Sequence, residues 1–216
     1  MSEAEQVEIG SGTQRDVTRL VNLSDAVVSI AATLLVLPLA TDASQGSVST
    51  LAALADQSGR HLLLFLLSFA VICRFWLVHH ALFDTIVAFN VPLFWINALW
   101  LVSIVVLPYT TGLIGAAQGN NQVATGVYIS TMLITTLAGL AMQWLINRSP
   151  ELHAPGMQRR LDLAPAVVIV VTMLLALVTA IVVPATGPWA LCLLIPSGQI
   201  SRLATHLVRR GRPAGN

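Results

Sequence analysis

The sequence predicts an all-α, polytopic membrane protein that forms a single domain over residues 1–216. Hydrophobic residues make up 56% of the chain and charged residues only 10%, whereas a soluble domain carries about 25% charged residues. The apolar residues also gather in runs long enough to cross a bilayer, which takes about 20 residues. These runs fill more than half of the chain and leave no room for a separate soluble domain.

Reading along the chain, we expect six transmembrane helices. The first follows Arg15 and Arg19, and a connector rich in Ser, Ala and Gly over residues 41–59 separates it from the second. Arginines lie between the fourth and the fifth, and Gly187-Pro188 indicates a tight turn before the sixth. The expected spans cover residues 21–39, 61–79, 92–114, 123–146, 163–183 and 189–207.

The arginines predict how these helices are oriented, because short loops rich in Arg and Lys stay in the cytoplasm. If there are six spans, three segments share one side, and they hold Arg15, Arg19, Arg148, Arg159, Arg160, Arg202, Arg209, Arg210 and Arg212. The loops on the opposite side hold only Arg60. We therefore expect both termini in the cytoplasm of a plasma-membrane protein. Amphipathic rings expected at the two membrane surfaces are Tyr109, Tyr128, Trp144 and Trp189.

Composition and missing motifs argue against several classes of function. A net charge of +1 gives no basic surface for nucleic acid. The chain lacks the HExxH and GxSxG motifs and a pair of intramembrane aspartates, so we expect no enzyme activity. His80 and Asp84 are spaced like metal ligands on a helix, but two ligands alone are weak evidence for a metal site. Cys73 and Cys192 lie in apolar runs and are expected to be buried thiols.

Polar residues inside the predicted spans are informative, because charged side chains in a bilayer usually face protein or water. Asp25 lies early in the first span, Arg74 and the pair His79-His80 lie in the second, and Asn97 lies in the third. Since neighbouring spans alternate in direction, these residues can meet at one depth. We interpret them first as a structural cluster that fixes helix packing. A proton relay, a metal site or a catalytic site are the alternatives.

A stripe of apolar residues follows one face of the first span. At about 100° per residue, Ile30, Leu34 and Leu37 stack on one side of the helix, with Ser29 and Thr33 beside them. Asp25 lies about 140° from Ile30 and therefore points toward the rest of the bundle. Such a stripe is more often core or lipid-facing than pore-lining when periodicity is the only evidence.

Three segments carry recognisable motifs. The first span reads Arg19-x-x-x-Leu23-Ser24-Asp25, the second reads Phe75-Trp76-x-x-His79-His80, and the third reads Asn97-x-x-Trp100-Leu101 with Pro108. These motifs resemble those of the transmembrane protein 175 family, which comprises endosomal and lysosomal potassium channels and shorter bacterial relatives. The family's pattern in the first span is Arg-x-x-x-Phe-Ser-Asp, so Leu23 stands here in place of Phe.

This resemblance implies a homotetramer in which four copies of the first helix line a central potassium-selective pore. It places the hydrophobic constriction on Ile30, Leu34 and Leu37, and the selectivity-linked hydroxyls on Ser29 and Thr33. The structural polar network would comprise Arg19, Ser24, Asp25, Arg74, Trp76, His79, His80 and Asn97. The implied partners are a second copy of the chain, the lipid bilayer and permeant potassium ions, with no cofactor, metal or nucleic acid.

A proton-coupled secondary transporter that uses Asp25 with His79 or His80 is the alternative function. Transporters usually show inverted repeats and spans interrupted by Gly or Pro near the midplane. The first span has no internal Gly, and its Pro38 comes only at the end. This pattern favours the channel.

Overall fold

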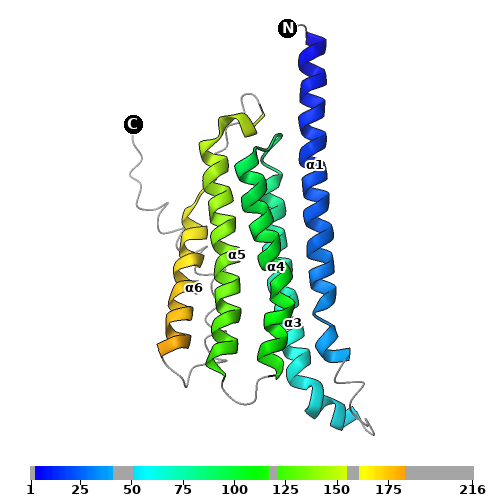
Figure 1. The fold of residues 1–216 in the computed structure, drawn as a ribbon, viewed down its shortest axis with the longest axis vertical. Coiled ribbons are helices and arrows are strands. Elements are labelled where there is room, and N and C mark those ends of the chain that lie inside the picture. Colours follow the sequence, from blue (N-terminus) through cyan, green and yellow to red (C-terminus); the bar gives the residue numbers. More distant parts are fainter. Residues whose placement is uncertain (1–2, 41–50, 117–120, 155–160, 183–216) are drawn as a thin grey trace, which may run out of the picture.

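The computed structural model describes residues 3–40, 51–116, 121–154 and 161–182, which are helical apart from short connections (Figure 1). Side chains are described from Arg15 onward in the first helix. In the second helix, burial is described at Gly59 and side chains from His61 onward. The elements are α1 (Glu3–Leu34), α3 (Leu51–Phe83), α4 (Val91–Ala116), α5 (Gln122–Arg148), the short 3-10 helix η1 (Pro150–Leu152) and α6 (Ala164–Val182). No strand occurs within these ranges, so the predicted all-α class is confirmed for them.

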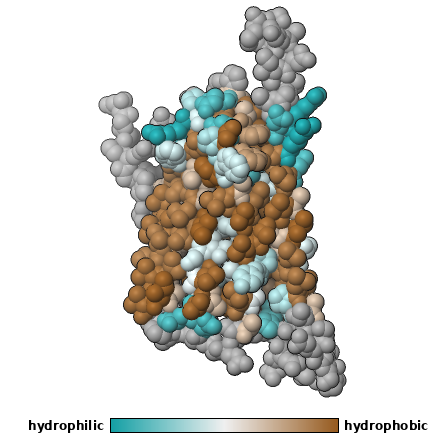
Figure 2. Space-filling model, viewed as in Figure 1, coloured by the Kyte–Doolittle hydropathy of each residue, from teal (hydrophilic) through white to brown (hydrophobic). Residues whose placement is uncertain are grey.

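Within the described residues, 5 helices are long and apolar enough to cross a membrane. They are Arg15–Ala40, His61–Phe83, Val91–Ala116, Gln122–Arg148 and Ala164–Val182, which agree with the first five expected spans to within a few residues. On the face drawn in Figure 2, hydrophobic residues form a broad band over the helices, with hydrophilic residues at both of its ends. The predicted sixth span, residues 189–207, lies outside the described residues.

Two elements extend further than hydropathy predicts. Helix α1 begins at Glu3 and projects beyond the other helices at its N-terminal end (Figure 1). Helix α3 begins at Leu51, so the expected connector over residues 41–59 is wrong in its second half. That half starts Leu-Ala-Ala-Leu-Ala, which are strong helix formers, and the helix continues from them into the apolar span.

Pro38 interrupts the end of α1. A proline has no N–H to donate to the carbonyl four residues earlier, which here belongs to Leu34, the last residue of α1. The chain makes a turn at residues 35–36, where the Val36 N–H donates to the Thr33 carbonyl at 3.2 Å, and a single helical turn follows over residues 37–40. Leu37 is therefore separated from Ile30 and Leu34 by a helix break.

Helix α4 holds the bundle together, because it contacts α1, α3 and α5. Its buried residues include Leu93, Ile104 and Leu107, which belong to the same hydrophobic core as Ile129 and Met142 of α5. Asparagine caps start both helices: the Asn90 side chain accepts from the Leu93 N–H, and the Asn121 side chain accepts from the Ala124 N–H.

Helix α6 packs on α5, and a side chain fixes the connection between them. The Asn147 amide donates to the Leu161 carbonyl at 2.9 Å and accepts from the Leu161 N–H at 2.8 Å. Two hydrogen bonds to one residue hold the start of α6 against the end of α5. The result is a close antiparallel pair.

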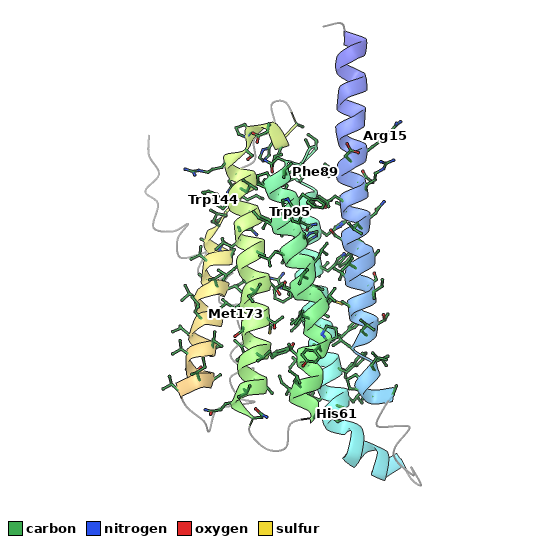
Figure 3. All side chains as sticks on the ribbon, in the orientation of Figure 1. Arg15, His61, Phe89, Trp95, Trp144 and Met173 are labelled. Atoms are coloured by element: carbon green, nitrogen blue, oxygen red, sulfur yellow. The ribbon has the colours of Figure 1, made fainter. Side chains whose placement is uncertain are left out.

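Aromatic residues mark the two ends of the band. Trp95 and Trp144 lie near the end at which Arg15 is found, and His61 lies near the other end (Figure 3). Tyr109 and Trp144 are exposed, as expected of interfacial rings. The expectation for Tyr128 is wrong, because its ring is only 2% exposed and its hydroxyl lies 3.4 Å from that of Ser68 inside the bundle.

Candidate pore helix and polar network

Helix α1 has one buried face and one exposed face. Val28 is only 6% exposed, and Ala31 and Leu35 are also buried against the bundle. On the other face Ile30 is 60% exposed and Leu34 is 38% exposed; Leu37, which follows the helix break, is 54% exposed. Leu23, which replaces the family's phenylalanine, is exposed on this helix as well. Large apolar side chains left uncovered by the chain require lipid or a second copy of the protein to cover them.

The two hydroxyl residues beside this stripe are also exposed, and both donate their hydrogen to the helix itself. The Ser29 hydroxyl donates to the Asp25 carbonyl at 2.7 Å, and the Thr33 hydroxyl donates to the Ile30 carbonyl at 2.8 Å. Because each hydrogen is used by the backbone, the remaining lone pairs of both oxygens face outward. Outward-facing lone pairs attract cations and water hydrogens.

Asp25 has a neutral hydrogen-bond donor as its partner. The Trp76 indole N–H of α3 donates to the Asp25 carboxylate at 2.7 Å, which links α3 to α1. The Trp76 ring also stacks on His80, with ring centroids 5.4 Å apart. A hydrogen bond to a charged acceptor in a partly buried position is among the stronger ones a protein makes.

A second set of contacts joins α1, α4 and α3 through fully buried side chains. The Asn97 amide N–H donates to the Ser24 hydroxyl at 3.1 Å, and that hydroxyl donates to the Leu20 carbonyl. The Asn97 carbonyl lies 2.7 Å from His79 Nε2. Because an amide carbonyl can only accept, His79 Nε2 carries a hydrogen and donates it.

The His79 ring is also held on both of its faces. It stacks on Trp100 and on Phe83, with ring centroids 4.2 and 4.4 Å apart. His80 lies 3.8 Å from Asp84 at the exposed end of α3, as their spacing predicts. No group of three or more His, Cys, Asp and Glu residues that could hold a metal ion occurs in the described part of the chain.

The structure therefore brings together Ser24, Asp25, Trp76, His79 and Asn97, with His80 stacked beside them. Arg19 and Arg74 are exposed and make no hydrogen bond or ion pair with this set among the described residues. Arg74 lines a cavity on the other side of α3.

Hydroxyl groups make further helix-to-helix contacts that sequence reasoning missed. The Thr111 hydroxyl of α4 lies 2.9 Å from the Ser68 hydroxyl of α3, and the Thr135 hydroxyl of α5 lies 2.9 Å from the Ser103 hydroxyl of α4. All four groups are buried. Ser and Thr inside apolar spans are the signal for such contacts, since hydroxyls often hydrogen-bond across membrane helices.

Comparisons with known proteins agree with this architecture. Residues 19–108 match the model of the family described as endosomal/lysosomal potassium channel TMEM175. A potassium channel of Streptomyces collinus is 29% identical over 63% of this chain and 68% of its own length. The sequence is therefore similar to this family over residues 19–108, which is less than half of the chain.

The fold also resembles a solved structure. A crystal structure of a TMEM175 homologue from Chamaesiphon minutus, described as a lysosomal potassium-selective channel, superposes with a TM-score of 0.56 at 24% identity. The match covers 85% of this chain and 99% of that chain. The family match over residues 19–108 includes all five residues that the structure brings together around Asp25 and Asn97.

Replacing Asn97 by leucine is expected to lower the thermal stability of the protein in detergent. The substitution leaves the His79 donor and the Ser24 hydroxyl without their partner, and a buried unsatisfied polar group costs about 1–3 kcal/mol. Thermal unfolding followed by size-exclusion chromatography measures the effect. Asn22→Leu, on the exposed face of α1, is the matched control and should have the same melting temperature as the wild type. Equal melting of both variants would contradict a stabilising role for Asn97.

Proposed function

We propose that this protein is a potassium-selective channel of the plasma membrane and a member of the TMEM175 family. In the proposed assembly, four subunits of six transmembrane helices surround a central pore lined by α1. Ile30, Leu34 and Leu37 form apolar constriction rings, and Ser29 and Thr33 lie beside them. The surrounding bilayer and a second copy of the chain are the partners, and potassium is the permeant ion. The channel requires no cofactor and catalyses no reaction.

The observation that supports α1 as the pore helix is the mixed character of its exposed face. This face carries Asn22, Ser29 and Thr33 among its apolar residues. On α6, by contrast, every exposed residue is apolar, which suits contact with lipid tails: Val167, Val171, Leu174, Leu175, Val178, Ile181 and Val182. Polar side chains at membrane depth usually face protein or water. Water in a central pore can hydrogen-bond to the polar side chains on the exposed face of α1, whereas lipid tails cannot.

Apolar rings control permeation through the cost of dehydration. A narrow ring of Ile or Leu side chains offers no oxygen to replace ion-bound water, so ions pass it only when they keep or partly lose their hydration shell. Potassium is larger than sodium and holds its water less tightly, so partial dehydration costs less for potassium. The outward lone pairs of Ser29 and Thr33 hold the remaining water in the pore.

Single-channel recording of the purified protein in a planar bilayer tests this function. Unitary current steps that reverse near the potassium equilibrium potential in mixed potassium and sodium solutions are the expected result. A slow, saturating flux that follows a proton gradient, without unitary steps, would instead identify a proton-coupled carrier. In that case Asp25 with His79 or His80 becomes the candidate coupling site.

The proposed topology places both termini in the cytoplasm. Reporter domains fused near Met1 and after Asn216 are both expected to show cytoplasmic activity, because arginine-rich segments stay on that side of the membrane. A fusion in the connector over residues 41–50 is the control and should read the opposite side. Termini on opposite sides of the membrane would mean an odd number of spans and would contradict the six-helix subunit.

A further inference from the structure

A cavity of about 330 Å³ lies behind the polar network, between α3, α5 and α6. Its volume is within the range of sites that hold small ligands, which runs from about 300 to 1,000 Å³. The walls are mostly apolar and include Leu67 of α3, Met132 of α5 and Met173 of α6. Met173 lies about midway along the helices, between Trp144 near one end and His61 near the other (Figure 3).

The polar groups of this cavity come from two helices. Arg74 of α3 and Gln143 of α5 both line it, and Gln143 immediately precedes the interfacial Trp144. The Gln143 side-chain oxygen is buried, and it has no hydrogen-bond partner within the part of the chain that the structure describes. Arg74 has no acidic partner among the described residues, and the described lining contains no Asp or Glu. A guanidinium and a buried acceptor thus share a cavity that is otherwise mostly apolar, and no described residue pairs with either of them.

We propose that this cavity binds an anionic phospholipid with a hydroxylated head group, of the phosphatidylglycerol type, from the leaflet at the Trp144 end. Arg74 donates hydrogen bonds to the lipid phosphate, and a head-group hydroxyl donates to the Gln143 oxygen. One acyl chain runs along Leu67 and Met173 toward the middle of the membrane. Basic pockets between transmembrane helices on the cytoplasmic side are suited to acidic lipid head groups.

Gly139 on α5 keeps the cavity open. It lines the cavity, and a Cβ atom placed on it would meet no other atom within 4 Å. A larger side chain at this position would therefore extend into space that the acyl chain needs, without strain on its neighbours. Gly126 on the same helix has equally open surroundings but does not line the cavity. These two glycines provide a matched pair of substitutions.

The cavity also touches the network behind the pore helix. His79 and Trp100 line it, and the same His79 ring bonds Asn97, which bonds Ser24 of α1. A lipid chain packed against this ring pair restrains His79 in the position that Asn97 requires. Lipid occupancy is therefore expected to stabilise the attachment of α1 to α3 and α4, whatever ion the protein conducts.

Photolabelling of the full-length protein in vesicles tests the proposal. The probe is phosphatidylglycerol with a photoreactive acyl chain, present at a trace level in phosphatidylcholine vesicles, and adducts are located by mass spectrometry. We expect adducts on cavity residues such as Val71 and Ile169, displaced by unlabelled phosphatidylglycerol but not by phosphatidylcholine. Arg74→Gln should reduce labelling about fivefold, the effect of losing one contact between a cation and an anionic lipid, whereas Arg15→Gln should not.

Gly139→Leu should abolish labelling of the cavity, and Gly126→Leu should leave it unchanged; both are first checked for wild-type elution on size-exclusion chromatography. Absence of cavity adducts, or equal displacement by both lipids, would overturn the proposal.

A second experiment tests whether the chain fills the cavity with its own predicted sixth span. Ala70→Cys and Gln199→Cys are combined in a protein with Cys73→Ser and Cys192→Ser. A disulfide between the new cysteines in this protein would also overturn lipid binding.

Discussion

Ile30→Asn is expected to raise ion conductance and to reduce the discrimination of potassium over sodium. The wild-type side chain is mostly exposed on α1, so four copies of one polar substitution meet around the proposed axis. Four amides would then supply hydrogen bonds where the constriction was apolar, which lowers the cost of ion dehydration for both cations. The reversal potential under bi-ionic potassium and sodium measures the loss of selectivity.

Val28→Asn is the matched control for this experiment. Val28 is two residues away on the same helix and is buried against the bundle, so an amide there disturbs packing without reaching the pore. Burying an unpartnered amide costs about 1–3 kcal/mol, and we expect lower expression with unchanged selectivity in the protein that remains. Unchanged permeation in Ile30→Asn together with altered permeation in Val28→Asn would require the pore face to be reassigned.

Trp76→Phe is expected to destabilise the subunit. It removes the indole N–H that bonds the Asp25 carboxylate and so leaves a charged group at membrane depth without its donor. Hydrogen bonds to charged groups contribute about 1.5–3 kcal/mol. The melting temperature and the yield of assembled protein on size-exclusion chromatography measure the loss. Trp95→Phe, at an exposed tryptophan on α4, should leave both unchanged.

Substitutions of Asp25 separate a structural role from a permeation role. Asp25→Asn retains an acceptor for Trp76 and should preserve assembly, whereas Asp25→Ala strands the indole N–H and should reduce assembly as Trp76→Phe does. The double variant Asp25→Ala/Trp76→Phe should lose little more than either single variant, because both break one contact. A stable assembly with a shifted ion preference in Asp25→Ala would make Asp25 a permeation residue instead.

Hydropathy alone was enough to place the five described spans, because each apolar run must be helical to satisfy its backbone inside lipid. It could not show where the helices continue in water. Helix α3 starts at Leu51, and the polar residues Asp56, Gln57 and Ser58 interrupt the hydropathy before the span without interrupting the helix. The helix breaks before Pro38 because proline has no N–H to donate to the Leu34 carbonyl. The predicted stripe placed Leu37 in line with Ile30 on the assumption that the helix continues unbroken through Leu37. The place of Leu37 on the pore axis therefore remains a prediction.

Helix geometry narrows the choice of partner for Asp25 on the second span, because the predicted network included both Arg74 and Trp76. Residues two apart on a helix point in nearly opposite directions, so Arg74 and Trp76 cannot both face α1. Once Trp76 bonds Asp25, Arg74 must lie on the far side of α3, where the cavity is found. The hydroxyl contacts of Ser68 and Ser103 were beyond reach, because periodicity within one span does not reveal which face meets which neighbour.

The central claim is that the exposed face of α1 lines an ion pathway, and cysteine accessibility along this helix tests it most directly. Single cysteines are introduced at successive positions from Ala26 to Val36 in protein with Cys73→Ser and Cys192→Ser, and a water-soluble, positively charged thiol reagent is applied during recording. The account predicts block of the potassium current at Ser29, Ile30, Thr33 and Leu34, and no block at Val28, Ala31 and Leu35. Block confined to the second group, or no dependence on position, would contradict it.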